Sequence, residues 1–179
     1  MTDEHRTPVE ERYFAEVLAR LRRLDNTDRG MFAEVLVAEA LPGAVLAQPW
    51  GSWDVTWNEV RIQVKCSGER QSWHQPDKPP TLATWTAPKR RHWDAATDTF
   101  SDAPGRFADV YVLARHTGYD HLTGWTFYVL ATNTLAKIAT PGGNVSLAVL
   151  EKAGIQPVDA DGLPDAVAHA HEEERARQP

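Results

Sequence analysis

Residues 52–66 read Ser-Trp-Asp-Val-Thr-Trp-Asn-Glu-Val-Arg-Ile-Gln-Val-Lys-Cys. Apolar and polar side chains alternate on both sides of the Asn-Glu pair at 58–59, which is typical of two strands that each bury one face. A two-residue turn at this pair predicts an antiparallel hairpin. The expected register places Asp54 opposite Gln63, and its other pairs are Trp57 with Val60, Thr56 with Arg61, and Val55 with Ile62.

The polar face of this hairpin combines three kinds of chemistry. Directly paired side chains have Cβ atoms ~4.5 to 5.5 Å apart, so the Asp54 carboxylate and the Gln63 amide oxygen are close enough to share one small cation. Ser52 and Lys65 are expected to face each other one rung further along. The other face, with Trp53 and its neighbours, is expected to supply tryptophan and aliphatic carbon to the core.

Length and composition predict one ordinary domain. The chain has 179 residues and 42% hydrophobic content, which is enough for a real core but short for two domains. No apolar run approaches the ~20 residues of a membrane helix, and the amino terminus lacks the pattern of a secretion signal. We therefore expect a soluble, cytoplasmic protein with a single domain over 1–156. Residues 157–179 are expected to form a polar tail, either helical or flexible.

Cysteine and histidine offer few sites. Cys66 is the single cysteine, which excludes an internal disulfide and a cysteine-based zinc site. Its place on the apolar face of the second hairpin strand favours a buried, inert thiol. Four histidines fall in expected loops without the helical spacing of a two-histidine metal motif, so we expect them on the surface: His74, His92, His116 and His121.

Charge is unevenly distributed along the chain. The formal net charge is -6, yet residues 61–92 contain seven basic and two acidic residues, so this window is +5 and the remainder is -11. A local basic surface on an acidic protein suits a polyanion that is contacted at one site. Six of the seven tryptophans also fall between residues 50 and 93, and Trp73 and Trp93 lie in polar surroundings where they could stack on bases. The candidate nucleic-acid-binding residues are Arg61, Arg70, Trp73, Lys89, Arg90 and Arg91.

Helices are expected at both ends of the chain and strands in the middle. A surface helix is predicted over about 8–24, with an apolar stripe packed on the domain. A second helix over about 29–41 is apolar around nearly its whole circumference. Burial would make its two acids, Glu34 and Glu39, costly unless another group compensates them. Further strands are expected at 44–47, 82–86, 108–115 and 125–131, and short helices at 132–138 and 146–153. This order predicts an α/β or α+β domain with a sheet of four or five strands flanked by helices.

An acid on a buried helix, an acid on a strand and a Gln-x-Lys on the partner strand resemble the signature of the PD-(D/E)xK, or restriction-endonuclease-like, nuclease superfamily. Gly30-x-x-x-Glu34 looks like the helix motif of that superfamily. The Trp-Asp at 53–54 takes the place of Pro-Asp, and Gln63-Val64-Lys65 takes the place of Glu-x-Lys. The resemblance covers roughly residues 29–138.

The resemblance implies a restriction-endonuclease-like core and a metal-dependent DNA endonuclease. Asp54 would be the bridging metal ligand, Gln63 the second side-chain ligand beside the Val64 carbonyl, and Glu34 a ligand directly or through water. Lys65 would position or help to deprotonate the attacking water. The implied ion is Mg, with Mn as a substitute, and the implied partner is DNA. A homodimer is expected for an enzyme that cuts both strands.

The departure at Gln63 keeps other functions open. A glutamine supplies a neutral oxygen, so it should weaken affinity for a hard divalent cation. The alternatives are a non-catalytic nucleic-acid-binding domain that kept the fold, and a protein-interaction domain that uses the tryptophan-rich loop. Asp54 and Lys65 could also be exposed charges that form a weak surface pair. Glu39 remains the reserve candidate for the helix acid.

Overall fold

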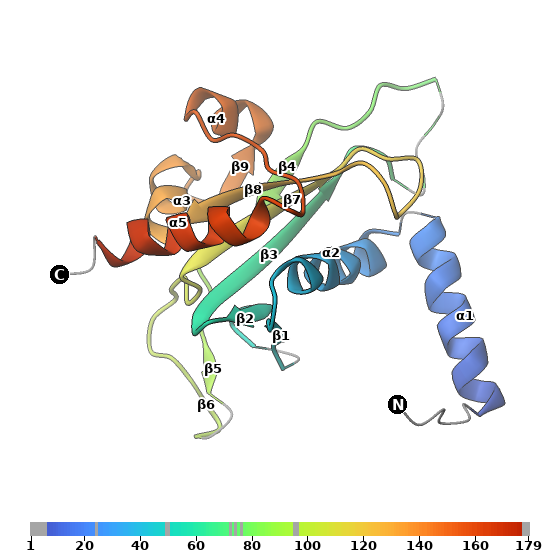
Figure 1. Ribbon diagram of the computed structural model, residues 1–179, viewed down its shortest axis with the longest axis horizontal. Coiled ribbons are helices and arrows are strands. Elements are labelled where there is room, and N and C mark those ends of the chain that lie inside the picture. Colours follow the sequence, from blue (N-terminus) through green and yellow to red (C-terminus); the bar gives the residue numbers. More distant parts are fainter. Residues whose placement is uncertain are drawn as a thin grey trace.

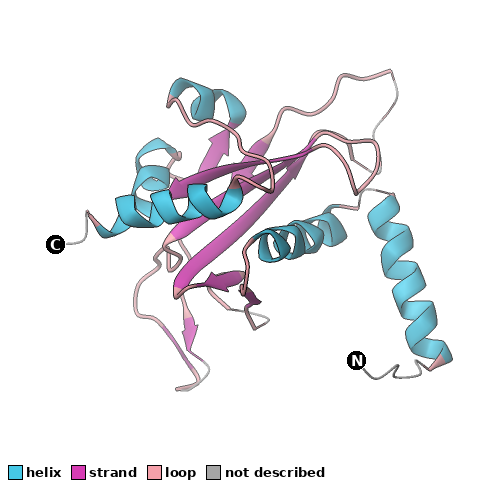
Figure 2. Cartoon of the chain, in the orientation of Figure 1, coloured by secondary structure: helices cyan, strands magenta, loops and turns pink. Residues whose placement is uncertain are grey.

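The computed structural model describes residues 7–23, 25–48, 51–71, 73, 75, 77–94 and 97–176. A five-stranded mixed sheet with flanking helices lies at its centre (Figures 1 and 2). The strand order is β1-β2-β3-β7-β8, with β3 and β7 parallel and the other neighbours antiparallel. The strands are β1 Val45–Leu46, β2 Val55–Trp57, β3 Val60–Gly68, β7 Val110–His116 and β8 Trp125–Ala131. The predicted α/β architecture is therefore confirmed at this level.

The hairpin of β2 and β3 has the predicted turn and register. Asn58 and Glu59 have φ of 47° and 68°, the left-handed conformation that a tight type I′ hairpin turn requires at both central residues. The paired positions are Val55 with Ile62, Thr56 with Arg61, and Trp57 with Val60. The paired positions end at Val55 with Ile62, and the backbone N–H of Asp54 also donates to the Ile62 carbonyl, at 2.9 Å, so the predicted pair of Asp54 with Gln63 is not a further rung of the ladder.

One face of the sheet is covered by two helices from opposite ends of the chain, α2 (Asn26–Ala40) and α5 (Leu163–Arg175). Their buried apolar side chains form one core cluster with those of β2, β3, β7 and β8, and its members include Ala33, Val37, Val64, Val112, Leu163 and Val167. The segment expected to be a loose polar tail thus contains a helix that is packed into the core, while its last residues, 177–179, lie outside the described residues.

The opposite face is covered by α3 (Thr132–Ile138), α4 (Leu147–Lys152) and a small sheet of β4 (Thr84–Thr86) and β9 (Asn144–Ser146). Trp85 of β4 is almost fully buried here, and its indole N–H donates to the Ala114 carbonyl at 2.9 Å. This second cluster is built on β7 and β8. The side chains that β3 presents on the same face line a cavity instead.

The first helix, α1 (Pro8–Arg22), projects away from the sheet and touches the body near the start of α2 (Figure 1). Arg20 forms an ion pair with Asp28 at 3.0 Å, and Leu21 is the buried apolar residue of the helix. We expected its apolar stripe to pack on the domain. Instead Phe14 and Leu18 are 48% and 39% exposed. Leu24, the expected last residue, lies outside the described residues.

The second helix is not buried on all sides as its composition predicted. It begins at Asn26 behind an Asp25 cap, earlier than expected, and it exposes Met31, Val35 and Glu39. It buries one side because the sheet covers only that side, while α1 leaves the other largely open. Among the helices of the described residues, none is long and apolar enough to cross a membrane.

Candidate active site

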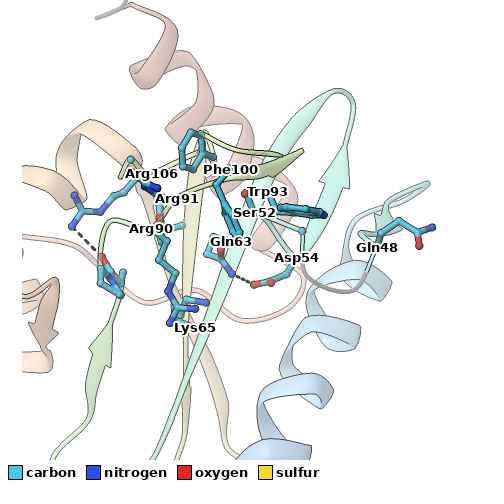
Figure 3. Close-up of a pocket in the computed structure, with 16 residues that line it drawn as sticks. Gln48, Ser52, Asp54, Gln63, Lys65, Arg90, Arg91, Trp93, Phe100 and Arg106 are labelled. Carbon is cyan, nitrogen blue, oxygen red and sulfur yellow. Dashed lines mark hydrogen bonds between the residues drawn. The ribbon is translucent and has the colours of Figure 1, made fainter. Parts of the chain in front are cut away.

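The predicted pair at the open end of the hairpin is in direct contact. Asp54 precedes β2, and its carboxylate accepts a hydrogen bond from the Gln63 side-chain amide (Figure 3). It also accepts one from the Val64 backbone N–H, at 2.7 Å. Gln63 and Lys65 are two residues apart on β3, so both side chains project from the same face of the sheet. The structure therefore brings these three polar side chains to one end of the sheet.

Burial and mutual charge both act on Asp54 and Lys65. Burial raises the pKa of the Asp54 carboxyl, whereas Lys65 and the two hydrogen-bond donors oppose that rise. Burial also lowers the pKa of the Lys65 ammonium, Asp54 opposes this effect, and Arg90 lowers the pKa further. Neither side chain is fully exposed, so a weak surface pair does not describe them. A lysine with a lowered pKa is suited to proton transfer near neutral pH.

Glu34 of α2 lies within electrostatic range of the same cluster. Burial, followed by the charge of Asp54, raises the pKa of Glu34 to about 7, and Lys65 opposes the rise. Glu39, the reserve candidate, is exposed on the same helix. Of these two acids, Glu34 is therefore the one within electrostatic range of Asp54 and Lys65. Glu34 is nevertheless outside the lining of the adjacent cavity.

A cavity of about 900 Å³ opens over Asp54, Gln63 and Lys65 (Figure 3). Its far wall is formed by residues 87–94 and 97–107, and reciprocal backbone hydrogen bonds between Arg90 and Gly105 at 2.9 and 2.8 Å join the two ends of this wall. The lining combines cationic with aromatic side chains, and besides Lys65 these are Arg90, Arg91, Arg106, Trp93, Phe100, Phe107 and Tyr111. Asp54 is the acidic residue among those that line it, so the cavity is cationic overall.

Two of the six predicted nucleic-acid contacts, Arg90 and Arg91, line this cavity. Lys89 precedes them and is exposed. Arg61 is instead paired with Asp109 at 2.6 Å, and its guanidinium lies 5.6 Å from the centre of the Trp53 ring. This pairing gives Arg61 a structural contact within the protein.

Arg70 and Trp73 lie beyond the far end of β3. The guanidinium of Arg70 is 3.8 Å from the centre of the Tyr119 ring and donates to its hydroxyl at 2.8 Å, while Trp73 is 69% exposed. Neither residue lines the cavity. Trp50 and His74 lie outside the described residues.

Trp53 and His92 differ from their predicted surroundings. Trp53 was expected in the core beside Val55, but it packs against the second core cluster, with its ring stacked on His92 at a centroid distance of 6.1 Å. The backbone turns before β2 begins, so the strict alternation does not extend to Trp53. The Ser52 hydroxyl, which was expected to face Lys65, contacts the His92 ring nitrogen. His92 is thus a partly buried packing residue.

Two other histidines are buried, contrary to the surface expectation. His116 is fully buried, and His121 is 9% exposed. The ring of His116 lies 4.4 Å from that of Trp125, and its Nε2 is 2.8 Å from the Asp120 carbonyl. Cys66 is only partly buried, against the first core cluster, and burial raises the pKa of its thiol to about 12.

Sequence reasoning missed several side chains of the cavity. Arg106 donates to the Ala87 carbonyl at 3.0 Å, which holds the two ends of the wall together (Figure 3). Phe107 packs on His92 at a ring distance of 5.2 Å. The sequence did contain a signal for them, because Arg106 and Phe107 are a basic and an aromatic residue just before a buried strand. They lie beyond the basic window, which ended at His92.

The donor atoms at Asp54 are of the kind that hard cations prefer. Among the described residues, no three His, Cys, Asp or Glu side chains are grouped as a metal site. A cation would therefore depend on Asp54 together with neutral oxygens. The Gln63 amide can present its oxygen after rotation, since amide N and O are nearly isosteric. The carbonyl and the N–H of Val64 point to the same side of β3, and this N–H donates a hydrogen bond to Asp54. Carboxylate and carbonyl oxygens suit Mg and Mn.

Comparisons with known proteins include a distant resemblance to a solved structure. No family model matches the chain, and no curated protein sequence matches it. Among solved structures, the chain resembles a bacterial homing endonuclease, I-Ssp6803I, with a TM-score of 0.45 and 16% sequence identity. The match covers 86% of this chain and 98% of that chain. A similarity at this level does not assign a function.

Proposed function

We propose that this protein is a metal-dependent DNA endonuclease with a restriction-endonuclease-like core and a PD-(D/E)xK-type site. One observation carries the proposal: Asp54, Gln63 and Lys65, arranged by the hairpin register, lie together at the floor of a cationic cavity. Hydrolysis of a phosphodiester needs a charged group to stabilise the phosphate and a positioned base for the attacking water. This cluster offers both kinds of group within one cavity.

Asp54 and Gln63 would hold Mg or Mn together with the Val64 carbonyl, and Glu34 would contribute through water. When bound, such an ion supplies charge stabilisation to the phosphate and lowers the pKa of a water molecule. Asp54 keeps its carboxylate oriented through the Val64 N–H. The charge of a bound cation would add to that of Lys65 in lowering the raised pKa of Glu34 and would so favour its ionised form.

Lys65 is assigned the role of proton acceptor or water-positioning group at its Nζ atom. Burial and the neighbouring Arg90 lower its pKa, which increases the fraction of neutral amine near pH 7. A neutral amine can take a proton from the attacking water, and the resulting ammonium can stabilise negative charge on the phosphate.

The arginines of the cavity wall suit a polyphosphate substrate. Arg90 and Arg91 come from one side of the wall, and Arg106 comes from the other. Guanidinium groups bind phosphate oxygens in a bidentate manner, so these side chains are assigned to the DNA backbone. The assignment predicts strongly salt-dependent binding.

A specific observation favours a second candidate, a nucleic-acid-binding domain without catalysis. The Gln63 amide donates to the Asp54 carboxylate, so the pair satisfies itself without a cation. Asp54 is also the acidic side chain of the cavity lining, which limits charge for a divalent ion. Under this reading, the arginines would bind nucleic acid while Lys65 has no chemical role.

The expected homodimer is also a proposal, and α1 offers a surface for it. Its exposed apolar side chains include Val9, Tyr13, Phe14 and Leu18. The helix carries acidic residues in its first turn and basic residues in its last turn. Two copies in antiparallel contact would therefore bring the acidic end of each α1 to the basic end of the other and cover the apolar side chains.

Calorimetric titration with Mn separates the enzyme from the binding domain. Wild type and Asp165→Ala, a matched change at an exposed acid of α5, are expected to bind Mn with equal affinity. Asp54→Ala is expected to lose that binding. Absence of binding by wild type, or equal binding by Asp54→Ala, would remove the metal site and favour the non-catalytic candidate.

A further inference from the structure

Aromatic rings are a prominent part of the cavity beside Asp54. Trp93 and Phe100 are carried by the short strand pair β5 (Trp93–Asp94) and β6 (Thr99–Phe100), with ring centres 4.9 Å apart. Phe100 is 58% exposed although it is a large apolar side chain. Figure 3 places both rings on the side of the cavity opposite Lys65. The wall therefore presents aromatic surface beside its arginines.

The other two aromatic residues of the lining have structural partners. Phe107 packs on His92, and Tyr111 is 4% exposed within the second core cluster. Their presence is explained by packing. Trp93 and Phe100 instead pair with each other at the rim, where Phe100 keeps more than half of its surface in water. Packing within the described residues leaves that exposed surface without an explanation.

A paired duplex offers little for these rings to bind. Its outer surface consists of phosphate and sugar, which the arginines can contact, while the faces of its bases are stacked inside. Unstacked bases expose π-faces, and stacking of one base on an aromatic side chain changes affinity by about 5- to 150-fold. The cavity, at about 900 Å³, is also within the size range of sites that enclose a drug-sized ligand.

We infer that the cavity binds an unstacked nucleobase on Phe100 and Trp93, so the substrate is DNA with unpaired nucleotides beside the scissile phosphate. The inference rests on the proposed nuclease function, because DNA that is bound but not cleaved would be a ligand and not a substrate. Single-stranded, bulged and branched DNA share this chemistry. In each, the arginines hold the backbone while a base leaves the stack and enters the cavity beside Asp54.

Binding in EDTA tests the inference separately from cleavage. The probes are a single strand, the matched duplex and the same duplex with a two-nucleotide bulge, each carrying 2-aminopurine at the equivalent position. We expect at least about 10-fold tighter binding of the single strand and of the bulged duplex than of the matched duplex. We also expect the fluorescence of the unpaired 2-aminopurine to be quenched when it stacks.

Variants at Phe100 distinguish stacking from general apolar contact. Phe100→Leu keeps an apolar side chain but removes the ring, and we expect it to lose the preference and most of the quenching. Leu122→Ala removes an exposed large apolar side chain from the loop between β7 and β8, outside the cavity lining, and is expected to behave as wild type. Both changes are at exposed positions, so both variants should fold.

The outcomes separate the two proposals. Equal affinity for matched and bulged duplex, or a full preference retained in Phe100→Leu, would overturn base binding even if the protein cleaves DNA. Selective binding of unpaired bases without cleavage in Mg or Mn would overturn the nuclease function and leave the base-binding cavity intact.

Discussion

Glu34→Gln is expected to stabilise the metal-free protein at pH 8 and to leave its stability unchanged near pH 4. The ordinary pKa of this carboxyl is 4.5, and the fold raises it to about 7, mainly through burial. Between these values the folded state binds more protons than the unfolded state, so the free energy of unfolding falls as pH rises. Glutamine cannot ionise, so the variant does not lose stability in this window.

The shift corresponds to about 3 kcal/mol if it were fully expressed, and solvent screening of a half-buried side chain reduces this to about 1 to 2 kcal/mol. Urea unfolding followed by tryptophan fluorescence, in EDTA and at several pH values from 4 to 8, measures the difference directly. Glu39→Gln is the matched control, because Glu39 is exposed on the same helix. A difference between Glu34→Gln and wild type that does not change with pH, or a destabilised variant at pH 8, would refute the placement of Glu34 in this cluster.

Three further predictions test other parts of the account. Arg90→Ala should weaken DNA binding and lower the salt dependence of the binding constant by about one counterion in a fluorescence titration. Lys137→Ala, a change at an exposed residue of α3, should do neither. Equal salt dependence for Arg90→Ala and wild type would contradict the assignment of Arg90 to the DNA backbone. The Cys66 thiol should react slowly with a disulfide reagent at pH 8 in the native state and rapidly in urea, because its pKa of about 12 leaves almost no thiolate; fast native reaction would refute its burial. Leu18→Asp should convert a dimer to a monomer in sedimentation analysis, whereas a monomeric wild type would exclude the α1 dimer.

Local patterns predicted the parts of the structure that depend on local interactions. The hairpin register followed from alternation and a two-residue turn, and both act within fifteen residues. The bounds of β8 and α3 agree with their predicted ranges. By contrast, periodicity shows which side of a helix is apolar but not what covers it, so it did not reveal that α1 leaves its stripe exposed. In α5, the three apolar residues that enter the core, Leu163, Val167 and Ala170, lie in a stretch with many charged residues, so the pattern did not predict that this helix packs into the core.

The same distinction applies to the candidate site. Asp54, Gln63 and Lys65 were predicted together because one hairpin positions all three. The wall of the cavity depends on the pairing of Arg90 with Gly105, a contact that no local pattern specifies. Phe100 is placed by the pairing of β5 with β6, and Arg106 by its contact with Ala87, which local patterns do not specify either. The burial of His116 likewise depends on Trp125, which belongs to the neighbouring strand.

Cleavage by wild type and by Lys65→Ala tests the central claim most directly. The substrates are supercoiled plasmid and a labelled bulged duplex, each in Mg, in Mn and in EDTA. We predict that wild type cleaves in Mg and in Mn but not in EDTA. We also predict that Lys65→Ala binds Mn as tightly as wild type but cleaves at least about 100-fold more slowly. Absence of cleavage by wild type in both Mg and Mn, or undiminished cleavage by Lys65→Ala, would contradict the account.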